Sequence, residues 1–377
     1  MDRNILIIAG EPSGDMRAAE LLKELRGLLS DASFWGIGGD RMKAEGVELI
    51  EHIKNFSLVG VWEVAKQIFK IRKQFNSLAC QITARKPRMA ILVDYPGFNL
   101  KVAAFLRKNK IPVVYYIIPQ VWAWGKWRIK ALKKFTDKIL VLFDFENDLL
   151  TRHGINCDFV GHPIIEKVPP LSASGAEKVK KGITISLLPG SRGHEIKNLL
   201  PVMLETAEKI AGHKPGINFI IAESSNIDRA LYDEYLSRHK GLRVSILKDD
   251  TFTCLEKSDA AIVTSGTATL ETAVMKKPFV IIYKASPLTY ILFRLFAKVR
   301  FIGLVNIIAG KEIVPELLQE KASPDKISSI ILDVLDNPAV AEKQREELGK
   351  IRAALGEKGA PYRAAVSIVN FIKSRGI

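Results

Sequence analysis

The amino-acid sequence predicts an α/β protein made of two Rossmann-like, doubly wound domains in tandem that face a cleft. Short runs of Val, Ile and Leu alternate with amphipathic stretches, a pattern typical of parallel strands covered by helices on both faces. The alternation stops at residues 166–182, a stretch rich in Pro, Ser, Gly and Lys, and then restarts. The length of 377 residues also favours two domains over one.

The first domain is predicted to span residues 1–165. Its apolar runs predict strands at residues 4–10, 33–39, 89–95, 111–119, 138–145 and 157–161. Amphipathic stretches between them predict helices at residues 13–28, 61–82 and 99–109. Helices that connect successive strands in this way produce a parallel sheet.

The second domain is predicted to span residues 183–350, after the linker at residues 166–182. Its apolar runs predict strands at residues 183–190, 217–224, 244–250, 260–266 and 278–284. A C-terminal helical segment follows at residues 351–377, with its strongest helical pattern from residue 362 to residue 373. It is free to pack on either domain, and we assign it to the first.

Composition narrows the classes of function. The formal net charge of +15 indicates an anionic partner, and the basic residues are interleaved with Glu and apolar residues and form no tail. We therefore rank a membrane surface and phosphorylated substrates above nucleic acid. Three widely spaced cysteines indicate neither disulfides nor a zinc site, which fits a cytoplasmic setting. No signal peptide or apolar run of the ~20 residues needed to span a bilayer is visible.

Two loops of the second domain have the residue types of a nucleotide-diphosphate site. Small and cationic residues at positions 190–192 follow the first strand and precede a helix: Gly190, Ser191 and Arg192. Ser265, Gly266 and Thr267 follow a later strand in the same way. Helix N-terminal amides and a guanidinium suit a diphosphate, and Glu271, one turn further on, is placed to accept ribose hydroxyls. An ordinary helix entry with a solvated arginine remains the competing interpretation of either loop alone.

The first domain places carboxylates where a phosphate loop would be expected. Glu11 and Asp15 follow the first strand, and Asp94 follows the apolar run MAILV. Carboxylates repel a diphosphate, so we expect this side to bind hydroxyl or amide groups, with Glu11 and Ser13 as acceptor contacts. Asp15 is expected simply to order the start of its helix. Asp94 is the predicted general base, although a turn-capping Asp before Pro96 is the structural alternative.

His162 in FVGHP is a second acid–base candidate, which we rank below Asp94 because a lone histidine is more often structural.

The predicted helix at residues 61–82 also suggests a membrane contact. Its core stripe recurs every three to four residues, and aromatic and basic residues project from the other side. These predicted contact residues are Trp62, Lys66, Phe69, Lys70 and Lys73. Incidental surface aromatics are the alternative.

Eight ordered motifs together resemble the lipid-A-disaccharide synthase family of glycosyltransferases. The resemblance runs from about Ile5 to beyond Asn306, through AGEPSGD, VDYPGFN, PQVWAW, FVGHP, LPGSRGHEI, SGTATLE, PFVIIYKASPLTY and GLVNIIAG. It implies a B-type fold built of two Rossmann domains and an inverting transfer with no cofactor and no essential metal. Arg192 matches the family's diphosphate-side arginine, Glu271 its nucleotide-loop glutamate, and Asn306 its asparagine in the segment GLVNIIAG. The resemblance implies that all three bind substrate. The chain departs from the family at Gly97, where a second acid is frequent, which concentrates the base role on Asp94.

The resemblance also implies the substrates. The donor would be UDP-2,3-diacylglucosamine and the acceptor 2,3-diacylglucosamine 1-phosphate, giving the β-1,6-linked disaccharide 1-phosphate and UDP. The first domain would then bind the acceptor and face the cytoplasmic surface of the inner membrane, and the second would bind the UDP-sugar. The family is compatible with a homo-oligomer.

Three alternatives remain open at this point. One is another B-type UDP-sugar enzyme, such as a transferase with a polyprenyl-linked acceptor or a UDP-N-acetylglucosamine epimerase. A second is a nonenzymatic binder of nucleotides or phospholipids, for which Asp94 would have no purpose. A dinucleotide-dependent dehydrogenase is disfavoured because no G-x-G-x-x-G opens either domain.

Overall fold

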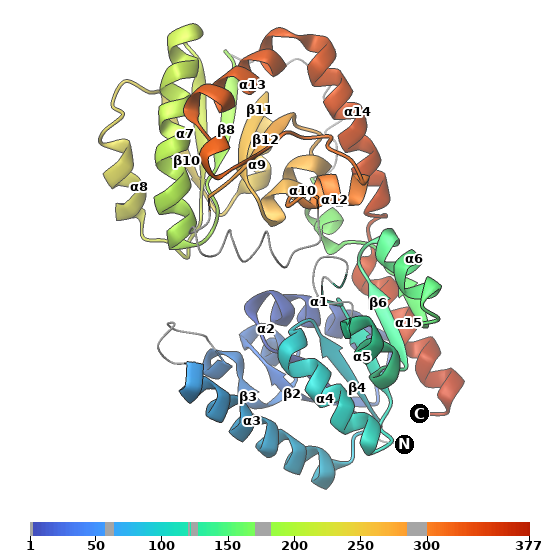
Figure 1. Cartoon of the computed structure of the whole chain (residues 1–377). Helices are drawn as coiled ribbons and strands as arrows, with labels where there is room; N and C mark the ends of the chain where they lie inside the picture. The colour runs from blue at the N-terminus through green and yellow to red at the C-terminus, as the bar shows by residue number, and fades with distance from the viewer. Residues whose placement is uncertain (1–2, 57–63, 120, 122–126, 170–181, 285–299) are drawn as a thin grey trace. The chain divides into compact units, whose positions relative to one another are not determined.

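The computed structural model describes residues 3–56, 64–119, 121, 127–169, 182–284 and 300–377 (Figure 1). The chain divides into two compact units. The first contains Met1–Glu166 together with Leu355–Ile377, and the second contains Lys167–Ala354.

The first unit is built on a seven-stranded parallel sheet. Its strands are β1 (Arg3–Ala9), β2 (Ala32–Gly38), β3 (Glu48–His52), β4 (Met89–Val93), β5 (Val113–Tyr116), β6 (Lys138–Val141) and β7 (Cys157–Phe159). They are arranged in the order β3-β2-β1-β4-β5-β6-β7, with β1 paired in parallel with both β2 and β4. This is the Rossmann order, in which the connections reverse direction between β1 and β4.

Helices cover this sheet (Figure 1). They are α1 (Pro12–Leu28), α2 (Asp40–Ala44), α3 (Val64–Arg85), α4 (Pro96–Lys108), α5 (Trp127–Phe135), α6 (Asp144–Arg152) and α15 (Ala360–Arg375), with short 3-10 turns η1 (Ile53–Phe56) and η3 (Pro163–Lys167). The C-terminal helix α15 packs against α1. Its first amides, those of Gly359 and Ala360, donate to Glu166 Oε1 at 2.5 and 2.9 Å.

The second unit repeats the architecture with six parallel strands. These are β8 (Thr184–Leu188), β9 (Asn218–Glu223), β10 (Val244–Lys248), β11 (Ala260–Thr264), β12 (Phe279–Tyr283) and β13 (Glu316–Leu318), in the order β10-β9-β8-β11-β12-β13. The helices are α7 (Gly193–His213), α8 (Arg229–Leu236), α9 (Thr251–Lys257), α10 (Thr267–Val274), α12 (Leu304–Ala309), α13 (Pro324–Asp336) and α14 (Pro338–Ala354), with the turn η4 (Gln319–Lys321). The connections reverse between β8 and β11.

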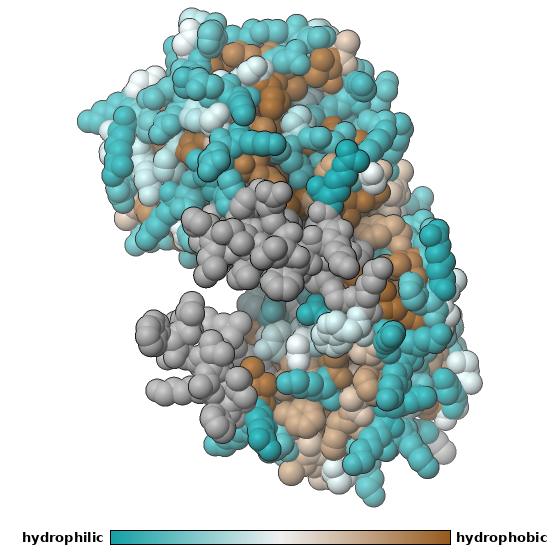
Figure 2. Space-filling model, viewed as in Figure 1, coloured by the Kyte–Doolittle hydropathy of each residue, from teal (hydrophilic) through white to brown (hydrophobic). Residues whose placement is uncertain are grey.

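The apolar runs of the sequence are the buried central strands. Every residue of β4 and β11 is buried, because helices cover both faces of each sheet. Outward-facing positions on the helices are polar, and Figure 2 shows mainly hydrophilic side chains over α8 on the drawn face. Within the described ranges, no helix is both long enough and apolar enough to cross a bilayer.

The predicted fold class is therefore confirmed for each unit, and each predicted strand is present. Two strands were missed. β3 and β13 lie at sheet edges; β13 has only three residues, and β3 carries Glu48, Glu51 and His52 among two apolar residues. A half-exposed edge strand needs no continuous apolar run, so its sequence pattern is weak.

Candidate active site

In a doubly wound sheet, ligands bind beyond the carboxyl ends of the strands that flank the reversal of the connections. In the first unit these are the ends of β1 and β4, and in the second the ends of β8 and β11. The predicted base and most of the predicted binding residues follow these four strands, whereas Asn306 lies on α12, after β12.

Asp94 follows β4, and Glu11 follows the adjacent strand β1. Burial, and next the negative charge of Glu11, raise the pKa of Asp94 to about 6, although the amide of Tyr95 donates to its carboxylate and opposes the shift. A carboxylate with a pKa near neutrality accepts a proton from an alcohol more readily than an ordinary aspartate does. The pKa of Asp94 is thus compatible with the role of general base, which remains a prediction.

The main chain at Asp94 has an uncommon conformation. Asp94 and Tyr95 both have φ of 48°, in the left-handed region, and together they turn the chain from β4 into α4. Such a conformation costs on the order of 1–3 kcal/mol at a non-glycine residue and persists only where the surroundings hold it. Three contacts do so: Tyr115 Oη and Asn99 Nδ2 each donate to the Asp94 oxygen at 2.7 Å, and the Asp94 amide donates to the Tyr116 oxygen.

Gly10, which ends the turn after β1, makes room for this arrangement. A Cβ placed at Gly10 would lie 2.1 Å from Cδ1 of the Tyr95 ring. The first glycine of AGEPSGD therefore serves close packing of an aromatic ring, which the sequence pattern does not reveal.

Glu11 and Ser13 are both exposed at the start of α1, where Glu11 is the N-cap residue and Pro12 opens the helix. Their side chains are accessible to a ligand at the same sheet edge as Asp94. Their predicted role as acceptor contacts remains a prediction.

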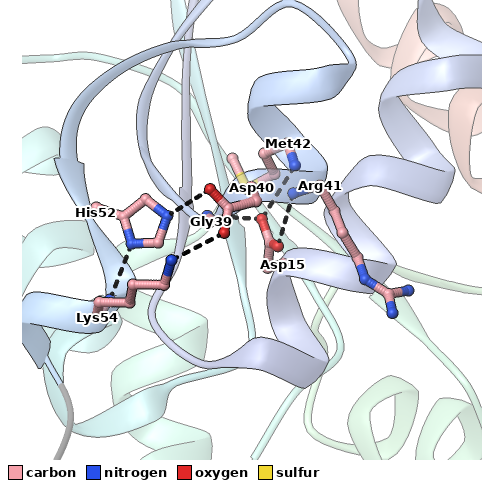
Figure 3. A network of polar contacts seen from close by, with 7 residues as sticks. All are labelled: Asp15, Gly39, Asp40, Arg41, Met42, His52 and Lys54. Atoms are coloured by element: carbon pink, nitrogen blue, oxygen red, sulfur yellow. Dashed lines mark hydrogen bonds and ion pairs between the residues drawn. The ribbon is translucent and has the colours of Figure 1, made fainter.

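Asp15 has a structural role, but it orders the start of α2 and not the start of α1, the helix in which it lies. Its buried carboxylate accepts the amides of Gly39 at 2.7 Å, Met42 at 3.1 Å and Arg41 at 3.2 Å (Figure 3). It therefore caps α2, which begins at residue 40, rather than the helix in which it lies. The neighbouring Asp40 is exposed and pairs with His52 and Lys54 (Figure 3).

His162 is not suited to acid–base catalysis. Burial, and then the charge of Arg17, lower its pKa to about 3, so the ring is neutral at pH 7. Its Nδ1 accepts the amide of Ile164 at 3.1 Å, and the ring packs on Phe143. His162 thus orders the turn after β7, which is the structural role that a lone histidine more often has.

In the second unit, α7 begins at Gly193, and the loop amides just before it already have an acceptor. The carboxylate of Glu195 accepts the amides of Ser191 at 3.0 Å and Arg192 at 3.2 Å, and also contacts the Arg192 guanidinium. Gly190 has φ of +104°, and a Cβ there would lie 2.3 Å from Glu195 Oε2. The amides of Ser191 and Arg192 are therefore already engaged within the loop, and its predicted contact with a diphosphate remains a prediction.

The Arg192 side chain itself is accessible, with 73% of it exposed. Sequence reasoning missed Glu195, although its position three residues after the N-cap is the one that a capping box uses. The guanidinium, although paired with Glu195 Oε1 at 3.1 Å, is therefore the exposed cationic group that this loop offers to an anion.

The second anion-suited loop follows β11 and opens α10 at Thr267. Gly266 and Thr267 are exposed, Glu271 is half-buried, and Ser265 Oγ donates to the Ile302 oxygen at 3.3 Å. The preceding residue, Thr264, has a buried hydroxyl without a hydrogen-bond partner in the part of the chain that the structure describes. Small polar groups thus gather where the sequence predicts them.

Asn306 does not have the geometry of a direct ligand contact. It is fully buried, its Nδ2 donates to the Val314 oxygen and to Glu316 Oε1, and its Oδ1 accepts the amides of Ile313 and Val314. All the hydrogen-bonding groups of its amide are thus engaged. The structure corrects the expectation: Asn306 ties α12 to the segment that leads into β13.

The predicted membrane contact falls largely outside what the structure describes. Trp62 lies outside the described residues, and so do the side chains of Lys66, Phe69 and Lys70. Lys73 lies on α3 and is exposed.

Comparison with known proteins identifies the family. The sequence profile described as lipid-A-disaccharide synthetase matches residues 5–367. The lipid-A-disaccharide synthase of Anaeromyxobacter dehalogenans is 40% identical over 375 residues, which cover 98% of this chain and 97% of that protein. The chain belongs to the lipid-A-disaccharide synthase family. The Myxococcus xanthus enzyme of the same name is 39% identical over 98% of this chain and 97% of its own length.

Solved structures agree on the fold. The calicheamicin glycosyltransferase CalG4 superposes with a TM-score of 0.63 at 12% identity, with both chains covered completely. A UDP-GlcNAc 2-epimerase from Neisseria meningitidis, solved with UDP-GlcNAc bound, has a TM-score of 0.61 at 13% identity and covers 98% of this chain and 100% of its own. These likenesses show the B-type glycosyltransferase fold and nothing finer. Family membership makes the chain a hexosyltransferase of lipid A disaccharide formation.

Proposed function

We propose that this family member condenses UDP-2,3-diacylglucosamine with 2,3-diacylglucosamine 1-phosphate to form the β-1,6-linked disaccharide 1-phosphate and UDP. The observation that carries the proposed mechanism is Asp94, a carboxylate at the end of β4 whose pKa is raised to about 6. Asp94 takes the proton of the acceptor's 6-hydroxyl as that oxygen attacks the anomeric carbon of the donor. The bond between this carbon and the UDP oxygen breaks, UDP leaves with the electron pair, and the configuration inverts.

We assign acceptor binding to the first unit. Glu11 and Ser13 are exposed at the sheet edge that carries Asp94, and carboxylate and hydroxyl oxygens accept hydrogen bonds from sugar hydroxyls and acyl amides. The pair Glu11 and Asp94 would repel a diphosphate, which supports the placement of UDP in the second unit.

We assign UDP binding to the second unit. The exposed Arg192 guanidinium is the main neutralising group, and the N-terminus of α10, entered through Ser265 and Gly266, contributes its dipole. Glu271 on α10 accepts ribose hydroxyls in this proposal. Stabilisation of departing UDP by these fixed groups requires no metal ion.

The direct test replaces the base and leaves the nucleotide loops intact. Asp94→Asn should lower turnover by ~10²–10⁴-fold, the typical contribution of a positioned base. UDP affinity, measured by calorimetry, should stay at the wild-type value because no nucleotide contact changes. Near-normal turnover with unchanged UDP affinity would refute the base assignment.

A UDP-N-acetylglucosamine 2-epimerase is the second candidate, because enzymes of that name share the fold. The two activities separate with a water-soluble substrate. An epimerase releases UDP from, or epimerises, UDP-N-acetylglucosamine alone, whereas the proposed transferase needs both acylated sugars. Turnover of UDP-N-acetylglucosamine in the absence of an acceptor would favour the epimerase.

We further propose that the protein works peripherally on the cytoplasmic surface of the inner membrane. The support is the sequence around α3, where Trp62 and Phe69 occur among Lys66, Lys70 and Lys73. Trp62→Ala/Phe69→Ala should reduce sedimentation with anionic vesicles and spare activity on detergent-solubilised substrates. Tyr362→Ala removes an exposed aromatic on α15, elsewhere in the first unit, and is the matched control. Unchanged vesicle binding by the double variant would refute this contact.

A further inference from the structure

Asp94 and Tyr95 are two successive non-glycine residues in the left-handed region, each with φ of 48°. A tyrosine has no intrinsic preference for this conformation, since its Cβ approaches the following carbonyl. The surroundings therefore impose it, and the groups that impose it also determine where the Asp94 Cβ and carboxylate point.

Two buried side chains from different elements converge on one atom of this turn. Tyr115 Oη, from the neighbouring strand β5, donates to the Asp94 main-chain oxygen at 2.7 Å. Asn99 Nδ2, from the first turn of α4, donates to the same oxygen at 2.7 Å and to the Val93 oxygen at 3.2 Å. Tyr115 and Asn99 are fully buried. A carbonyl oxygen has two lone pairs, so the two donors satisfy it and fix the peptide plane in two directions.

We propose that Tyr115 and Asn99 are positioning residues for sugar transfer, which hold the main chain of Asp94 so that its carboxylate is aimed at the acceptor hydroxyl. This inference rests on the proposed base role of Asp94 and extends it to two groups that touch no substrate. Rotation of the Asp94 peptide would swing the carboxylate away, and a misplacement of about 1 Å lowers a rate by roughly 10²-fold.

The strand β5 supplies its own matched control. Tyr116 is the next residue, equally buried, and its hydroxyl has no hydrogen-bond partner among the residues that the structure describes. Tyr115→Phe and Tyr116→Phe each delete one oxygen from a buried ring on the same strand. Only the first deletion removes a hydrogen bond to the Asp94 turn.

The experiment compares these two variants in steady-state transfer across pH. Tyr115→Phe should lower kcat by about 10–100-fold with the KM values within about twofold, the pattern of an interaction that acts on the transition state. It should also move the acidic limb of the pH–rate profile, because the environment of the Asp94 carboxylate changes. Tyr116→Phe should match the wild type in both respects. Asn99→Ala, which removes the other donor, should change kcat in the same direction as Tyr115→Phe.

A double variant shows whether Tyr115 works through Asp94. In the Asp94→Asn background, Tyr115→Phe should cause no further loss of turnover, because the group that it positions is already absent. The inference is overturned if Tyr115→Phe keeps wild-type kcat and an unmoved acidic limb while Asp94→Asn has lost turnover. It is also overturned if the two losses simply multiply. Retained turnover in Asp94→Asn alone would instead contradict the proposed function.

Discussion

Asp94 and Glu11 follow adjacent parallel strands of one sheet, and the negative charge of Glu11 contributes to raising the pKa of Asp94. Two carboxyl groups that share a site do not ionise equally easily. The exposed one, Glu11, meets solvent, whereas the half-buried one is left with a pKa near neutrality. In the proposed mechanism, Glu11 of the motif AGEPSGD thus contributes by raising the pKa of Asp94, without itself transferring a proton.

The first prediction concerns the pH dependence of transfer. The profile of kcat/KM should have an acidic limb near pH 6, where Asp94 loses its proton and becomes a base. Glu11→Gln removes a negative charge, so ionisation of Asp94 becomes easier, its pKa falls and the limb moves to lower pH. Initial rates of UDP release at subsaturating substrate, from pH 5 to pH 8, measure it. A limb that stays in place in Glu11→Gln, or that moves to higher pH, would contradict the coupling.

The second prediction concerns stability. The pKa of Asp94 is about 6 in the folded protein and 3.8 in the reference state, so the folded state holds this proton more tightly than the unfolded state does. Wild-type stability therefore falls as pH rises between these two values, and the full penalty is present above pH 6. Asp94→Asn should be more stable than the wild type by about 1–3 kcal/mol at pH 8, since one pKa unit corresponds to ~1.4 kcal/mol.

Urea unfolding of the two proteins, followed at pH 8 and at pH 4, measures this difference. The gain should disappear at pH 4, where Asp94 is largely protonated in the folded wild type and no buried charge remains. A variant that is less stable than the wild type at pH 8 would show that the carboxylate makes favourable contacts that outweigh its burial.

The third prediction concerns UDP. Arg192→Ala should weaken UDP binding by roughly 10–100-fold, the loss expected for a charge-assisted contact with a diphosphate. Arg238 is the matched control, because it is a comparably exposed arginine of the second unit, 62% accessible and paired with Glu234 in the last turn of α8. Calorimetric titration with UDP should give Arg238→Ala the wild-type affinity. Equal affinities for the two variants would remove Arg192 from the nucleotide site.

The fourth prediction concerns Asp15, whose carboxylate accepts three amides at the start of α2. Asp15→Ala leaves these donors without their acceptor and should destabilise the protein by about 2–4 kcal/mol. Asp40→Ala removes a neighbouring acid that is exposed and bonded only to His52 and Lys54 among the interactions shown in Figure 3. Its unfolding midpoint in urea should equal that of the wild type. A similar midpoint for Asp15→Ala would show that α2 does not depend on this cap.

Asp15 and Asp94 differ in how much of their surroundings the sequence predicts. Both acids come soon after strands, and the strand-end rule predicts both to lie at the carboxyl edge of the sheet. Asp15 turned inward because the amides that it caps lie 24 to 27 residues further along the chain, brought beside it by the pairing of β1 with β2. A hydrogen bond between residues so far apart in the chain depends on the tertiary structure, and no local sequence pattern predicts it.

Glu195 and Tyr115 were missed for related reasons. Glu195 occupies a capping-box position, which is a local sequence signal. The basic and glycine residues around it, however, are equally typical of a phosphate-binding loop. Tyr115 lies within an apolar strand, where an aromatic residue predicts only core packing. Its hydrogen bond to Asp94 depends on the register of β5 against β4, which the sequence of neither strand reveals.

The most direct test of the account is the formation of radiolabelled disaccharide from the two acylated sugars. Wild-type protein, given UDP-2,3-diacylglucosamine and labelled 2,3-diacylglucosamine 1-phosphate, should convert the label to a disaccharide 1-phosphate and release one UDP for each product molecule. Asp94→Asn should form the same product at least ~10²-fold more slowly. The account would be contradicted if the wild type formed no disaccharide from this pair, or if UDP appeared at the same rate without the acceptor.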